Sequence, residues 1–215
     1  MTSPRIFISM GTPYAPKYVE FRAALERFFR DDCDADPRIL GVNEYPSGNP
    51  LQKIHDVMRT CHGVVIVAYE RKYIGSGTEK RTAPTPIALD QRTYTTPWNH
   101  IESALAYSLD LPIYIICENG LTEEGLIETK VDWYVQRIDF TPDQLREAGV
   151  SQSIRAWIDD RVRPLADKPR AFKAIEGSLK LSEMTPKELW GVGAGIAAVF
   201  AAGVAAGRFL PHLFG

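Results

Sequence analysis

Two short, continuously apolar runs at residues 64–69 and 113–117 constrain the fold of this chain more than any other feature. Neither run alternates polar with apolar residues, so both are typical of central strands in a parallel sheet that is covered on its two faces. Elsewhere apolar residues recur at helical spacing, as at Phe21, Leu25 and Phe28. Strands that alternate with helices predict an α/β fold with helices on both faces of the sheet.

The first 165 residues contain five segments that we expect to be strands and four that we expect to be helical. The strands are expected over residues 5–10, 39–42, 64–69, 113–117 and 134–140, and the helices over 21–29, 51–61, 97–109 and 145–162. This order predicts a doubly wound, five-stranded parallel sheet. The polar segment 70–96 is longer than an ordinary connection, and it predicts a mobile lid or, alternatively, a disordered insert.

The charge balance and the spacing of cysteine and histidine exclude several kinds of partner. The chain has 25 Lys and Arg residues against 27 Asp and Glu residues, so it has no basic surplus that would draw it onto nucleic acid. Its three cysteines and four histidines show neither a Cys-x-x-Cys motif nor metal-ligand spacing. We therefore expect no metal site, no disulfide framework and a reducing compartment.

The C-terminal part of the chain differs in composition from the rest. Residues 189–207 carry no charge, and as a helix they would span about 28 Å, which is close to the thickness of the bilayer core. We therefore expect an α/β domain over 1–165, a linker over 166–188 and a single transmembrane helix over 189–210. Because the run is rich in Ala and Gly, a soluble helix that packs on another helix is the alternative.

The flanks and spacing of this tail indicate its orientation and its tendency to associate. Five basic residues precede the apolar run between positions 168 and 187, whereas only Arg208 closely follows it, so the large N-terminal part is expected on the cytoplasmic side of the membrane as a C-terminally anchored protein. Gly191, Gly195, Gly203 and Gly207 lie at multiples of four residues and would form one helix stripe. Such a stripe lets two helices approach closely and predicts a homo-oligomer.

Two loops that follow expected strands are candidates for ligand binding. In an open parallel sheet, ligands bind beyond the carboxyl ends of the strands. Ser9, Gly11 and Tyr14 lie in or after the first strand, and the loop with Ser47, Gly48 and Asn49 follows the second strand. The first loop lacks the Gly-x-Gly-x-x-Gly and Gly-Lys-Ser/Thr patterns, so neither a dinucleotide fingerprint nor a P-loop is expected.

The helix expected after Pro97 carries the most informative side chains. Helical spacing places Trp98, Asn99 and Glu102 on one flank, with Ile101 and Leu105 expected to face the sheet. A carboxylate beside an aromatic ring suits reactions in which a sugar becomes cationic at its anomeric carbon, because the negative charge stabilises that cation. The alternative is that Glu102 is an ordinary exposed helical residue.

The order of these motifs resembles the TIR domain family and the related nucleoside 2-deoxyribosyltransferases over roughly residues 4–163. The matching segments are 5–9 for the opening strand, 46–50 for the loop after the second strand, 61–67 for the third strand and 98–102 for the catalytic helix. Met10 to Tyr14 looks as much like the transferase entry loop as the TIR one, and segment 70–96 is longer than in most TIR domains. The resemblance implies a TIR-like or flavodoxin-like α/β domain that cleaves or exchanges N-glycosidic bonds.

The resemblance also implies roles for individual residues. Glu102 would be the catalytic glutamate, Trp98 and Asn99 would shape the pocket, and the two candidate loops would contact the substrate. The substrate would be NAD or a related nucleotide, which is hydrolysed or cyclised, with no separate cofactor. Enzymes of the TIR type are commonly activated by clustering, and a bacterial antiviral or cell-suicide effector would follow by analogy.

Two other functions fit the same sequence. In the first, the chain is a non-catalytic TIR-like adaptor or nucleotide sensor that signals by association at the membrane, and Glu102 is an ordinary helix residue. In the second, the chain keeps its catalytic glutamate but exchanges the base of a deoxynucleoside. The preferred substrate and the dependence of base release on Glu102 distinguish these hypotheses about the function.

Deletion of residues 189–215 is expected to move the protein from the membrane fraction to the soluble fraction. The physical reason is that the deleted segment contains the whole uncharged run of membrane length. The measurement is fractionation of cells that express the intact and the shortened chain. An intact chain found wholly in the soluble fraction would contradict the predicted anchor.

Overall fold

The computed structural model describes residues 3–44, 48–128 and 133–167, and its main element is a five-stranded parallel sheet in the order β2-β1-β3-β6-β7. The strands are β1 (Arg5–Met10), β2 (Asp36–Arg38), β3 (Gly63–Ala68), β6 (Ile113–Glu118) and β7 (Tyr134–Ile138). The helices are α1 (Pro16–Arg27), α2 (Pro50–Arg59), α3 (Pro97–Ser108), α4 (Ala148–Trp157) and α5 (Arg163–Ala166). The predicted α/β fold with a five-stranded parallel sheet is therefore confirmed.

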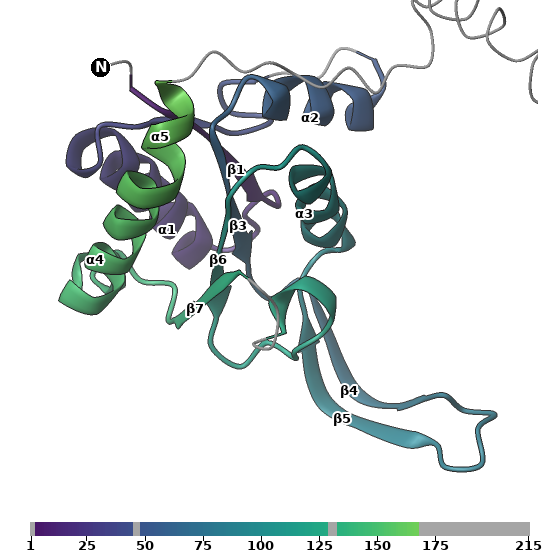
Figure 1. Ribbon diagram of the computed structural model, residues 1–215. Coiled ribbons are helices and arrows are strands. Elements are labelled where there is room, and N and C mark those ends of the chain that lie inside the picture. Colours follow the sequence, from purple (N-terminus) through teal and green to yellow (C-terminus); the bar gives the residue numbers. More distant parts are fainter. Residues whose placement is uncertain (1–2, 45–47, 129–132, 168–215) are drawn as a thin grey trace, which may run out of the picture. The chain divides into compact units, whose positions relative to one another are not determined.

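Helices cover both faces of this sheet because successive strand residues point to opposite faces. In β1, Ile6 and Ile8 join the core cluster that includes α1 and α4, whereas Phe7 joins the cluster that includes α2 and α3. Every residue of β3 and β6 is buried, as expected for strands covered on both sides. Figure 1 shows α1 and α4 on one side of the sheet and α2 and α3 on the other.

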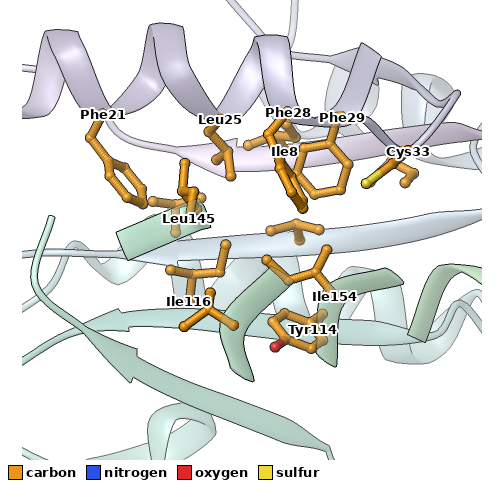
Figure 2. Close-up of a cluster of buried hydrophobic side chains, with 14 of the residues drawn as sticks. Ile8, Phe21, Leu25, Phe28, Phe29, Cys33, Tyr114, Ile116, Leu145 and Ile154 are labelled. Atoms are coloured by element: carbon orange, nitrogen blue, oxygen red, sulfur yellow. The ribbon is translucent and has the colours of Figure 1, made fainter. Parts of the chain in front are cut away.

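Aromatic and branched side chains fill the core on the side of α1 and α4 (Figure 2). Phe21, Leu25 and Phe28 lie about one helical turn apart, so α1 presents one apolar stripe to the sheet. The ring of Phe21 stacks on Phe140, with centroids 4.1 Å apart. Tyr114, although it lies on a central strand, satisfies its hydroxyl by a 2.9 Å hydrogen bond with Ser153 of α4.

The second strand lies earlier in the chain than the sequence predicts. It covers Asp36–Arg38 rather than 39–42, and Ile39 is buried just beyond it. The Asn43 side chain accepts a hydrogen bond from the Ile39 backbone N–H at 2.7 Å, and Gly41 adopts a positive φ of 77°. A side chain that bonds to the nearby backbone offers the chain an alternative to the sheet ladder, so the strand ends in a turn here.

Segment 70–96 is a β-hairpin, so the alternative of a disordered insert is wrong. Its strands β4 (Lys72–Glu79) and β5 (Ile87–Tyr94) pair in antiparallel register, and Pro84 and Pro86 lie in the connection between them. Most residues of both strands are exposed, and the hairpin extends away from the parallel sheet in Figure 1. Whether it closes over a ligand as a lid stays a prediction.

The order of the strands places a topological switch point between β1 and β3. The chain leaves β1 for β2 on one side, returns to β3 on the other side, and then continues outward to β6 and β7. Beyond the carboxyl ends of β1 and β3 the connecting loops diverge, which is where open α/β sheets bind their ligands. The hairpin and the start of α3 follow β3 in the chain, so this edge of the sheet gathers most of the predicted site residues.

Among the described residues, no helix is both long enough and apolar enough to cross a bilayer. The predicted transmembrane helix over 189–210 and all but two residues of the predicted linker over 166–188 lie outside the described part of the chain. The membrane anchor and the homo-oligomer stay predictions from the sequence.

A side chain added at Gly63 is expected to destabilise the fold, because this residue packs closely against the end of α4 and the helical turn Ile158–Val162 that follows it. A Cβ atom there would lie 2.9 Å from Val162 Cγ2 and 3.0 Å from Trp157 Cη2. Gly63→Ala should therefore lower the free energy of unfolding by about 1–3 kcal/mol, measured by urea denaturation. Gly149→Ala is the matched control, because a Cβ atom on this α4 glycine meets nothing within 4 Å and should leave stability unchanged or raise it. Equal effects of the two substitutions would contradict the close packing at Gly63.

Candidate active site

Tyrosine hydroxyl groups join the loops that leave β1 and β3 at the switch point. The Tyr69 hydroxyl donates a 2.7 Å hydrogen bond to the Gly11 carbonyl, and the Tyr14 hydroxyl donates a 2.8 Å bond to the Glu70 carbonyl. A Cβ atom at Gly11 would lie 3.4 Å from the Tyr69 hydroxyl and 3.8 Å from Thr96 Cγ2. The loop after β1 therefore passes close to both β3 and the beginning of α3.

The first turn of α3 begins with favourable capping. The Thr96 hydroxyl accepts a hydrogen bond from the backbone N–H of Trp98 at 3.3 Å, and Pro97 occupies the first helical position, where its missing N–H costs nothing. The sequence Thr-Pro thus fixes where α3 starts. Because the start is fixed, the residues of the next two turns have defined directions relative to the sheet.

A buried polar network attaches this part of α3 to β1. Asn99 Nδ2 donates to Ser9 Oγ at 2.9 Å and to the Ser9 carbonyl at 3.3 Å, while Asn99 Oδ1 accepts from the Thr95 hydroxyl at 2.7 Å. All three residues are less than 5% exposed. Ser103, one turn later, donates its hydroxyl to the Asn99 carbonyl at 2.6 Å. Polar groups buried this deeply must be hydrogen-bonded, so the network fixes the position and rotation of α3 on the sheet.

Glu102 lies next to this network and is the group with the clearest chemical potential. It is 9% exposed, and desolvation raises the pKa of its carboxyl to about 7, although a hydrogen bond with Ser9 lowers the pKa in part. Among the described residues Glu102 forms no ion pair. A carboxyl that exchanges its proton near neutral pH suits a nucleophile, an acid or a base.

The expected orientation of α3 is partly wrong. Ile101 was expected to face the sheet, but it is 41% exposed, and Asn99, Glu102 and Ser103 are buried instead. The reason is tertiary: Ser9 offers the polar side chains partners on the sheet, which a periodicity argument from one helix does not include. Trp98 is 44% exposed, so its indole lies at the surface of the helix start rather than among the buried groups.

A second buried carboxylate, Glu118, lies at the end of β6 and contacts residues of α1 and the segment after β3. It pairs with Lys17 Nζ at 2.6 Å, accepts from the Tyr18 hydroxyl at 3.0 Å, and accepts from the Glu70 backbone N–H at 2.9 Å. Burial raises the pKa of Tyr18 far above its usual value, so its hydroxyl stays protonated and donates. Glu118 therefore connects the start of α1 and the end of β3 to β6.

Glu118 directly follows the apolar run 113–117, and it was not predicted as a site residue from the sequence. The one available signal is its position, because a carboxylate directly after a continuously apolar strand must find partners if it is buried. The same holds for Thr95 and Ser103, which lie four residues on either side of Asn99. Thr95 lies just before α3 and Ser103 lies within it, and their spacing from Asn99 does not show that this side of the helix start is buried.

The second predicted loop is only partly described. Ser47 lies outside the described residues. Gly48 adopts a positive φ of 102°, and the Asn49 side chain caps α2 by accepting a 3.0 Å hydrogen bond from the Leu51 backbone N–H. The geometry thus assigns Gly48 and Asn49 a role in starting α2, and their contact with a ligand stays a prediction.

The described residues contain no cluster of three or more His, Cys, Asp or Glu side chains that could hold a metal ion. The candidate site is therefore described by its carboxyl, amide, hydroxyl and aromatic groups. Ser9, Asn99 and Glu102 lie buried together on one face of this edge. On the other face the loop with Gly11 and Tyr14 contacts the end of β3.

Comparison with known proteins yields similar folds only. Neither a protein-family model nor a curated protein sequence matches the chain. A CMP N-glycosidase from Clostridium botulinum is 13% identical, with a TM-score of 0.43 over 68% of this chain and 98% of that structure. The flavoenzyme NAD(P)H:(acceptor) oxidoreductase FerB from Paracoccus denitrificans is 8% identical, with a TM-score of 0.37 over 77% of this chain and 98% of that structure. At these scores the likeness assigns no activity to the chain.

The raised pKa of Glu102 predicts how stability depends on pH. The folded carboxyl binds its proton up to about pH 7, whereas the unfolded one loses it near pH 4.5, so the free energy of unfolding should fall as pH rises through this interval. Relative to Glu102→Gln, which stays neutral, the wild type should lose about 3 kcal/mol between pH 4.5 and 8. The measurement is urea denaturation at a series of pH values. The exposed Glu20→Gln variant serves as the control and should follow the wild type, and parallel curves for wild type and Glu102→Gln would contradict the desolvated carboxyl.

Proposed function

We propose that the protein cleaves the N-glycosidic bond of a nucleotide and that Glu102 is its catalytic carboxyl group. The observation that carries this proposal is a glutamate that is nine-tenths buried at the switch-point edge of a parallel sheet, with a pKa raised to about 7. Desolvating a carboxyl costs free energy that a purely structural residue would not need to spend. Perturbed carboxyls at ligand-binding edges are candidates for catalysis.

The chemistry needs the ionised form of Glu102. As the C1′–N bond breaks, its electron pair leaves with the base and the sugar becomes cationic at C1′. The Glu102 carboxylate either stabilises this cation or forms a bond to C1′ that water later breaks. In both cases water supplies the hydroxyl group of the product and releases one proton to solvent. The low-dielectric surroundings of Glu102 strengthen its attraction for the developing cation.

We propose NAD as the substrate because of its leaving group. The nicotinamide ring of NAD carries a positive charge while it is attached to ribose, so it departs as a neutral molecule and needs no proton. A neutral nucleoside base departs well only when an acid protonates it. Among the described residues, Glu102 is the buried carboxyl at this edge without an ion-pair partner, while Glu118 is engaged by Lys17, Tyr18 and the Glu70 backbone. One carboxylate without a separate acid suits a cationic leaving group better.

The surrounding residues would position the substrate. Ser9 and Asn99 fix α3 and thereby the direction of Glu102. Tyr14, which is 54% exposed, presents a ring beside the loop after β1, and Arg71 lies 5.6 Å from the centre of that ring. Trp98 presents a second exposed ring at the start of α3. Exposed aromatic rings near a sheet edge are suited to stack on flat heterocycles.

The wider setting in this proposal follows from the sequence. The tail would anchor the enzyme to the membrane, and the glycine stripe would bring copies together there. An enzyme that consumes NAD on clustering would serve as an antiviral or cell-suicide effector, which is the role that the family resemblance implies. The experiment below therefore uses the full chain in detergent and in artificial clusters.

The proposal predicts that Glu102→Gln abolishes release of nicotinamide from NAD. The expected loss is about a hundredfold or more, since a charge that stabilises the transition state is removed while the shape of the side chain is kept. Chromatography of the released base measures it, with Glu20→Gln as the control. Because the carboxylate is the active form, kcat/KM should rise with pH up to about 7 and then level off.

Three outcomes would contradict parts of this proposal. Nicotinamide release that is equal in wild type and Glu102→Gln would remove Glu102 from the mechanism. Faster release of base from deoxynucleosides than from NAD would favour base exchange over NAD cleavage. No release from either substrate, with the full chain in detergent and in artificial clusters, would favour the non-catalytic adaptor.

A further inference from the structure

A pocket lies at the opposite end of the sheet from the candidate active site. The pocket, of about 360 Å³, lies beside Ile113 and Tyr134, the first residues of β6 and β7. It is therefore at the amino-terminal ends of these strands, whereas Ser9, Asn99 and Glu102 gather at the carboxyl edge. Its volume falls within the range of pockets that hold small molecules.

Aromatic rings form much of the lining of this pocket. Tyr107 and Trp133 lie edge to face with centroids 6.3 Å apart, and Trp157 lines another part of the wall. Tyr134 stacks on the buried ring of Tyr114, with a centroid distance of 5.9 Å and an angle of 5° between the planes. Even so, Tyr107 is 69% exposed and Tyr134 is 66% exposed. Neighbouring side chains thus hold the rings in place, while much of each tyrosine surface is open to a ligand.

Two charged side chains of opposite sign complete the lining. Asp160 and Arg161 both face the pocket from the π-helical turn Ile158–Val162 that continues α4. Neither side chain has a hydrogen-bond or ion-pair partner within the described part of the chain. The pocket therefore offers a strong hydrogen-bond acceptor, Asp160, and a strong donor, Arg161, and the charges of the two side chains sum to zero. A neutral ligand with its own donors and acceptors matches this pair better than a phosphate, which Asp160 would repel.

We propose that this pocket binds a nucleobase, as the free base or as a nucleoside. A base has a flat face for stacking on the aromatic rings and an edge with adjacent donors and acceptors for Asp160 and Arg161. Stacking of one base on an aromatic side chain contributes about 1–3 kcal/mol. The site stands apart from Glu102 in the fold, and the inference does not rest on the proposed function.

The test is calorimetric titration of the full chain in mild detergent with adenosine, guanosine, cytidine and uridine, and with the free base and the 5′-monophosphate of each. Glu102→Gln is the background in every titration, so that the proposed chemistry consumes no ligand. At least one nucleoside should bind with a Kd below about 1 mM. Tyr107→Ala and Asp160→Asn should each weaken that binding fivefold or more. The variant Arg92→Ala changes an exposed residue of β5 that does not line the pocket, so it should bind as the background does.

Several results would overturn the proposal. One is that no nucleoside or free base binds. Another is that binding is unchanged by Tyr107→Ala and Asp160→Asn, which would place the ligand outside this pocket. A third is that the 5′-monophosphate binds more tightly than the nucleoside, because repulsion between Asp160 and the phosphate predicts the reverse. Tyr107 and Asp160 are exposed, so the thermal unfolding midpoint of both variants should equal that of the background.

Discussion

The hydrogen bonds between Asn99 and Ser9 are the contact on which the candidate site depends. They join a helix to a strand ninety residues earlier in the chain, and both side chains are almost fully buried. An apolar contact would tolerate rotation of α3, but a buried amide that loses its partner costs about 1–3 kcal/mol. The network therefore selects one rotation of the helix. That rotation buries Glu102 and leaves Trp98 at the surface.

The burial of Glu102 is unfavourable for the fold, and the sheet compensates for it. The buried residues of β3 and residues 113–117 of β6 place apolar groups on both faces of the centre. This hydrophobic core supplies most of the stability of such a domain. An edge that contains buried polar groups can then be retained without losing the fold. Glu118 is another buried polar group at this edge, and its charge is balanced locally by Lys17.

The sequence predicts the central strands well because their signal is local. Runs of apolar residues mark β3 and β6, and the Thr-Pro pair marks the start of α3. The shift of β2 was missed because the side chain of Asn43 bonds to the backbone of Ile39, and the hairpin was missed because its strands carry few apolar residues. The exposure of Ile101 was missed because it depends on Ser9, a partner distant in the chain. For the site, the position of Glu102 on the helix could be predicted, whereas its burial required Ser9 of β1. The partners of Glu118 from α1 and β3 are likewise a product of the fold.

The roots of the β4–β5 hairpin give it a mechanical connection to the sheet edge. One root is Arg71, whose guanidinium bonds to the Thr12 carbonyl at 3.0 Å, and the other leads directly into Thr95, which bonds to Asn99. Thr93 also bonds to the Gly120 carbonyl after β6. The hairpin is therefore tethered at its base to three separate segments of the carboxyl edge, so its base cannot be displaced without breaking hydrogen bonds to the loop after β1, to the turn after β6 or to the first turn of α3.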